Sequence, residues 1–138
     1  MADEKPLSDE LFHGIIAFIT DDSDFTLDAG VVRLSQAFPR RQVSRTHQEI
    51  IVAAKNWRLW LHYVDEPFVA EESQEMASWF AGHQVASRIA GCKRRIEFSG
   101  TNIEPGSRCF SDFCKACEVL NRFHGTIIFD LEDRDVFC

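Results

Sequence analysis

Three cysteines close together in the chain have a spacing that matches the ligands of a metal–sulfur cluster. They form the pattern Cys109-x4-Cys114-x2-Cys117, and Cys138 follows further along. This order of thiols is typical of plant-type [2Fe–2S] proteins, in which four thiolates converge on two iron atoms. Such a site would make the protein an electron carrier or a redox enzyme.

The residues around these cysteines favour a buried helix instead. Apolar side chains recur there at helical spacing, at Phe110, Phe113, Cys114, Cys117 and Leu120. On a helix, Cys109 and Cys114 point well apart, so three thiolates cannot converge unless the helix unwinds. We therefore predict small apolar residues on a buried helix face, with no cofactor and no metal ligand.

A thiol- or metal-dependent enzyme or redox protein that uses Cys109, Cys114 and Cys117 is the alternative. Cys109 is the best candidate nucleophile because it lies near an expected helix start beside Arg108, where a positive environment would favour the thiolate. A thiolate nucleophile also needs a base and an oxyanion donor. The sequence identifies neither group, so we expect a protein that is not an enzyme.

The other motifs with chemical potential are incomplete. Asp22-x-Asp24-x-Thr26-x-Asp28 resembles the start of a calcium loop, but Leu27 replaces the glycine and Arg33 replaces the bidentate glutamate. The five histidines lack metal-binding spacing, and the sequence contains neither a glycine-rich phosphate loop nor Gly-x-Ser-x-Gly. These patterns predict turns and helix caps.

Length and charge narrow the class of protein further. The chain has 138 residues, which fits a single globular domain over 1–138 with a loose N-terminal arm at 1–10. A formal net charge of −7 argues against nucleic acid as a partner, and no apolar run is long enough to cross a membrane. The N-terminal residues lack the features of a secretory signal, so we expect a cytoplasmic protein with reduced thiols.

The order of apolar runs predicts an α+β fold. Strands are expected at 12–20, 49–54, 57–64, 94–99 and 126–130, with a short return edge at 136–138. Helices are expected between Thr26 and Pro39, after Pro67, and across the cysteine-rich segment; Gly82 either ends or interrupts the second, and we predict two pieces there. The architecture is thus a mixed or antiparallel sheet of about five strands, with three or four helices packed on it.

Acidic residues gather in two turns that each follow a strand. The first turn holds Asp21, Asp22, Asp24 and Asp28, and the second holds Asp130, Glu132, Asp133 and Asp135. If the ends of the two strands lie together, these carboxylates form one negative rim that would steer a basic protein to this surface. The alternative is that both are ordinary solvated turns.

The end of the chain carries a family resemblance. The segment His124-Gly125-Thr126-Ile127-Ile128-Phe129-Asp130, continuing through Phe137, has the order helix end, glycine, strand, acidic turn and phenylalanine. With its small acidic α+β form, the protein resembles immunity proteins of bacterial polymorphic-toxin and contact-dependent systems over the last third of the chain. The resemblance implies a binding protein that neutralises a cognate toxin, often by covering its active cleft with an acidic surface.

This hypothesis assigns the partner-binding surface to the two acidic turns and to exposed aromatic anchors. The residues are Asp21, Asp22, Asp24, Asp28, Trp60, Asp130, Glu132, Asp133, Asp135 and Phe137. Alternation along 57–64 places Trp60 on the second face of its strand, where it is either covered by another element or available to a partner. A non-catalytic subunit of a larger assembly is a further alternative.

Overall fold

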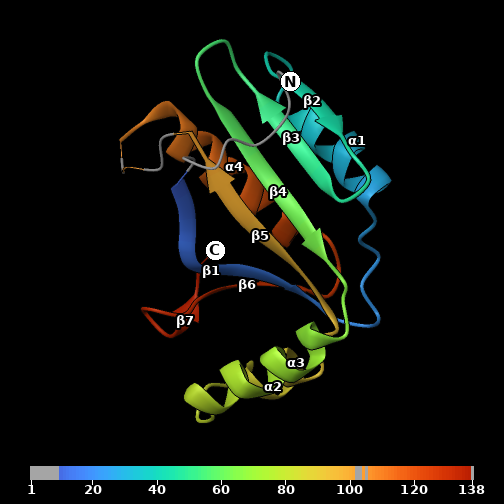
Figure 1. The fold of residues 1–138 in the computed structure, drawn as a ribbon, viewed down its shortest axis with the longest axis vertical. Coiled ribbons are helices and arrows are strands. Elements are labelled where there is room, and N and C mark those ends of the chain that lie inside the picture. Colours follow the sequence, from blue (N-terminus) through green and yellow to red (C-terminus); the bar gives the residue numbers. More distant parts are fainter. Residues whose placement is uncertain (1–9, 102–103, 105, 138) are drawn as a thin grey trace.

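A fully antiparallel sheet of seven strands forms the centre of the molecule (Figure 1). The computed structural model describes residues 10–101, 104 and 106–137. The strands are β1 (Glu10–Ile19), β2 (Gln42–Arg45), β3 (Glu49–Ala53), β4 (Arg58–Val64), β5 (Arg94–Gly100), β6 (Thr126–Asp130) and β7 (Asp135–Val136), and their order in the sheet is β2-β3-β4-β5-β1-β6-β7. The α+β class is confirmed, and the sheet has seven strands rather than the expected five or so.

Strand β1 lies between β5 and β6 and is buried on both faces. Its continuous apolar run predicted a central strand, and this prediction is confirmed. Ala17 and Ile19 belong to the core on one side of the sheet, whereas Phe18 belongs to the core on the other side, and all three are fully buried. Because neighbouring side chains of a strand point to opposite faces, β1 contributes to both cores at once.

Helices α1 (Leu27–Ala37) and α4 (Arg108–Asn121) cover one face of the sheet and contact each other. In Figure 1 they lie behind the strands. Thr26 caps the N-terminus of α1 by accepting a 3.0 Å hydrogen bond from the Ala29 N–H, as its position predicts. At the other end, Pro39 directly follows the C-cap residue Phe38. The Ser107 hydroxyl caps α4 in the same way, at 3.0 Å from the Phe110 nitrogen.

The other face carries α2 (Phe68–Trp79) and α3 (Ala86–Ala90), which form a separate pair in the lower part of Figure 1. The prediction of two helical pieces is therefore confirmed. Phe80 stacks on Phe129 of β6 with ring centroids 4.3 Å apart, which joins the end of α2 to the sheet. Within the described residues, no helix is both long and apolar enough to cross a membrane.

The extra strands are short and sit at the edges. Strand β2 falls in a segment for which the sequence predicted no strand, and its only large apolar side chain is Val43. Its pairing with β3, and not a pattern of apolar residues, makes this segment a strand.

Strand β7 begins one residue before the expected return edge at 136–138. The predicted arm at 1–10 lies outside the described residues except for Glu10, which begins β1.

We predict that Gly125→Ala destabilises the fold by about 1–3 kcal/mol, because Gly125 has a φ of +76° in the turn between α4 and β6. A Cβ atom there would collide with the Thr20 hydroxyl and approach Ser23 to 3.0 Å. Gly82→Ala is the matched control, since an added Cβ would meet nothing within 4 Å. Urea denaturation of both variants measures the difference, and equal unfolding free energies would contradict this account of the turn.

Candidate functional site

The two acidic turns lie at opposite ends of the sheet. Strands β1 and β6 are antiparallel, with Ile19 paired to Thr126 and Ile15 paired to Asp130. The turn that follows β1 is therefore level with the start of β6, and the turn that follows β6 lies at the far end. The strand ends do not meet, so the eight carboxylates of the two turns do not form one rim.

Internal contacts already engage the first acidic turn. Asp21 pairs with Lys93 at 3.7 Å, Asp22 with His124 at 3.1 Å and Asp28 with Arg45 at 2.7 Å, while Asp24 accepts a 2.9 Å hydrogen bond from the His124 backbone N–H. Hydrogen bonds from the Thr20 hydroxyl and from His124 lower the pKa of Asp22 below its usual value. Asp22 and Asp24 thus hold the β1–α1 turn against His124, just before β6, whereas Asp21 and Asp28 contact Lys93 before β5 and Arg45 of β2.

The second acidic turn keeps part of its charge available. One oxygen of Asp130 accepts hydrogen bonds from the N–H groups of Glu132 and Asp133, at 2.9 and 3.3 Å, which shapes the turn. The side chains of Glu132 and Asp133 are exposed, and no basic group of the described residues pairs with them. The carboxylate of Asp135 lies 3.0 Å from Nε2 of His83, in the connection between α2 and α3.

The two predicted aromatic anchors are not surface anchors. Trp60 is only 1% exposed, so the interpretation in which another element covers it is correct. Phe137 is half-buried, and its ring packs against Phe113 of α4 with centroids 5.6 Å apart. Both side chains therefore contribute to the fold, and an anchoring aromatic has to be sought elsewhere.

Helix α2 carries two exposed aromatic side chains on its outer side. Phe68 is 42% exposed and Trp79 is 51% exposed, which is unusual for rings of this size. They are eleven residues apart, or three turns, so they lie along the same side of the helix with Glu75 between them. The buried side of α2 is formed by Val69, Ser73 and Ala77. The predicted partner-binding residues include neither Phe68 nor Trp79, and their eleven-residue spacing is the sequence signal that places both rings on one side of the helix.

Carboxylates surround these two rings. Residues 65–91 contain five carboxylates and only one arginine, and Glu71 and Glu75 pair with no basic group in the described part of the chain. The contact between His83 and Asp135 places β7 beside the C-terminal end of α2. We name this region the acidic α2–β7 surface, and it comprises Phe68, Glu71, Glu75, Trp79, Glu132, Asp133, Asp135 and Val136.

A buried arginine attaches α2 to the sheet. Arg95 of β5 is 6% exposed, and its guanidinium lies 2.8 Å from carboxylate oxygens of both Glu72 and Glu97. The same guanidinium lies 5.6 Å from the centroid of the Phe68 ring. One buried cation is thus shared by two carboxylates, which fixes the rotation of α2 and directs Phe68 and its neighbours outward.

The cysteines occupy the helix that their apolar spacing predicted. Cys109 and Cys117 are buried in α4 and Cys114 is half-buried, while Cys138 lies outside the described residues. No group of three metal-binding side chains occurs in the part of the chain that the structure describes. Cys92 is also buried, and desolvation raises the pKa of its thiol to about 12, which disfavours the reactive thiolate.

Comparison of the chain with protein-family models, with curated proteins and with solved structures finds no match in any of the three. The chemistry of the acidic α2–β7 surface is therefore the basis for assigning a function.

We predict that His83→Ala raises the pKa of Asp135, because the hydrogen bond from His83 is the largest cause of its lowered pKa. A lowered carboxyl pKa contributes stability above its usual value of 3.8, and that contribution is lost as the pH falls through the lowered value. Carboxyl ¹³C NMR titration measures the shift. His124→Ala is the control, since it should raise the pKa of Asp22 and leave Asp135 unchanged. An unshifted Asp135 in His83→Ala would contradict the contact.

Proposed function

We propose that this protein binds and neutralises a cognate bacterial toxin, and that the acidic α2–β7 surface makes the contact. The observation that carries the proposal is the pair of exposed rings, Phe68 and Trp79, on a helix side that also presents Glu71 and Glu75. A large apolar side chain that remains exposed in a folded protein is typical of a binding surface. Inhibition by association also fits the family resemblance of the C-terminal segment.

The composition of this surface supports tight protein association. Tryptophan is among the residues that contribute most to binding energy when a partner buries them, and glutamates at the rim exclude water and select the partner. Truncation of such an anchor commonly costs about 2 kcal/mol or more of binding free energy. Because Arg95 fixes the rotation of α2, the two rings are already oriented before the partner arrives, which lowers the entropy lost on binding.

Charge defines the kind of partner that fits. The helix pair on this side of the sheet has a clear excess of carboxylates, and the β6–β7 turn adds Glu132 and Asp133. Such a field attracts a protein with basic groups around its binding or active cleft and accelerates its association at low salt. A toxin that acts on an anionic substrate, such as a nucleic acid, would present basic groups of this kind.

The direct test expresses this protein together with the product of a neighbouring gene. The proposal expects that product to arrest growth when expressed alone, and co-expression of this protein to restore growth through a stoichiometric complex. A neighbouring product that is not toxic, or growth arrest that persists although both proteins are made, would count against the proposal.

We predict that Trp79→Ala weakens the complex by at least about tenfold, because the indole ring is the largest exposed apolar group on the surface. Val32→Ala is the matched control, since Val32 is also exposed but lies on α1, on the other side of the sheet. Glu71→Lys combined with Glu75→Lys should mainly slow association. Surface plasmon resonance with the purified toxin measures both effects, and equal affinities for Trp79→Ala and Val32→Ala would assign the contact to another surface.

A further inference from the structure

We infer that the seam between α1 and α4 is a second binding site, which takes an extended, carboxylate-rich peptide segment of a protein partner. Six basic residues line three cavities along α4: two of the cavities lie against α1 and the loop after it, and the third lies against Asn56 and Trp57 of the β3–β4 turn. We name these residues the basic α1–α4 row: Arg33, Arg40, Arg41, Arg108, Lys115 and Arg122. The cavities measure about 400, 290 and 340 Å³, and Asp112 is the only carboxylate among the described residues that line them. This site lies on the opposite side of the sheet from the acidic α2–β7 surface and does not depend on the proposed function.

The row has a regular spacing along α4. Arg108 and Lys115 of α4, and Arg122 at its C-cap, are each seven residues apart, so they lie on the same side of the helix axis. At a rise of 1.5 Å per residue, neighbouring charges are separated by about 10 Å along the helix axis. Each of the three belongs to a different cavity, so the cavities follow one another along the seam.

Aromatic rings hold three of the cations in place. The guanidinium of Arg33 lies 3.9 Å from the centroid of the Phe123 ring, that of Arg41 lies 4.9 Å from the centroid of the Trp57 ring, and Nζ of Lys115 lies 5.0 Å from the centroid of the Phe38 ring. Contact with the face of a ring stabilises a cation without neutralising it. The charges of Arg33 and Lys115 are therefore oriented but still able to attract an anion, whereas the charge of Arg41 is paired with Asp112.

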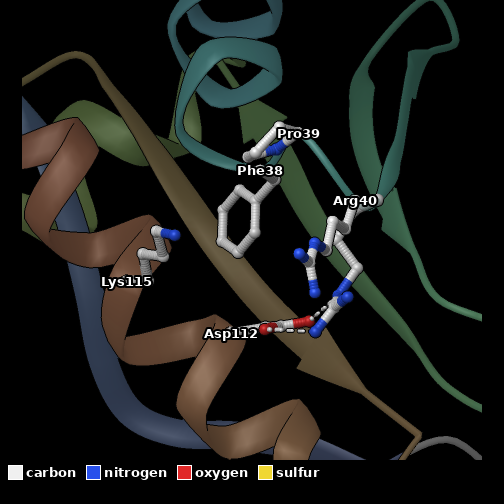
Figure 2. A pocket seen from close by; sticks show the side chains of 6 residues that line it. Phe38, Pro39, Arg40, Asp112 and Lys115 are labelled. Carbon is white, nitrogen blue, oxygen red and sulfur yellow. Dashed lines mark hydrogen bonds and ion pairs between the residues drawn. The ribbon is translucent and has the colours of Figure 1, made fainter.

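The central cavity shows how little of this charge is compensated (Figure 2). Asp112 is 6% exposed and accepts hydrogen bonds of 2.8 Å from both Nε of Arg41 and Nε1 of Trp57. That carboxylate is fully engaged by these donors. Within the described residues, Arg40 and Lys115 pair with no carboxylate, and Figure 2 shows both beside the Phe38 ring. In a chain with a net charge of −7, a concentration of unpaired cations of this kind is a specific feature of the surface.

The spacing and the covered rings select the kind of ligand. An extended peptide in the polyproline II conformation advances about 3.1 Å per residue with three residues per turn, so every third side chain points to the same side and would reach the next cavity. A small single anion would occupy only one of the three cavities. Single-stranded nucleic acid binds through open aromatic faces on which bases stack, whereas Phe38 and Phe123 are buried and a cation lies over each ring. An acidic peptide segment is therefore the ligand that the seam fits best.

The test measures binding of a fluorescent peptide of repeating Glu-Gly-Ser units to the full chain by anisotropy at low salt. We expect saturable binding that added salt weakens, and no binding of the matching Gln-Gly-Ser peptide. Lys115→Glu should reduce the affinity by about tenfold or more, because it reverses the central charge of the row, whereas Lys115→Arg should retain binding. Arg88→Glu makes the same change of charge on α3 and should leave binding unchanged.

Three outcomes would overturn the inference. One is equal loss of binding in Lys115→Glu and Arg88→Glu, which would reflect net charge alone. Another is tighter binding of an oligo-dT strand than of the acidic peptide, which would assign the row to nucleic acid. The third is self-association seen by sedimentation and abolished by either Lys115→Glu or Glu75→Lys, which would make a second copy the occupant. Failure of toxin binding in Trp79→Ala would bear only on the proposed function.

Discussion

The burial of β1 on both faces is the constraint from which the rest of the architecture follows. Phe18 and Ile19 are adjacent in the chain and both are fully buried, yet they belong to different cores. A strand of this kind requires a helical layer on each side of the sheet, because either face would otherwise expose apolar side chains to water. The pair α1 and α4 therefore lies on one side, and the pair α2 and α3 lies on the other.

The sheet consequently separates two surfaces of opposite charge. Helices α1 and α4, with the loop that leads into β2 and Arg122 just after α4, contain six basic and three acidic residues, whereas 65–91 contain five carboxylates and one arginine. Exposed charges on opposite sides of a domain are largely screened from each other by salt, so the two surfaces act independently. The net charge of −7 is a sum over the whole chain, so it does not give the local charge of either surface. A binding protein built in this way can discriminate between partners of opposite charge, because each side repels the partner of the other.

Sequence reasoning succeeded where one segment determines its own structure, and it failed where contacts between distant segments determine the position of a side chain. The apolar run of β1, the Thr26 cap and the helical spacing around the cysteines are local signals, and each predicted the correct element. The buried Asp112 is different, because its donors Arg41 and Trp57 are 71 and 55 residues away in the chain. The outward rotation of Trp79 likewise depends on how Arg95 fixes α2, which no local pattern reveals.

The acidic turns show why a cluster of charges in a sequence is a weak guide to a binding surface. Both clusters follow strands, and in a parallel pair such turns would meet at one edge, but antiparallel pairing of β1 and β6 separates them. Aspartates in tight turns also have a structural role, since Asp24 and Asp130 accept hydrogen bonds from nearby backbone N–H groups. Glutamates such as Glu71 and Glu75 on the outer side of α2 make no contact of this kind. Glu71 and Glu75 on this helix, with Glu132 and Asp133 of the second turn, are thus the carboxylates whose charge remains for a partner.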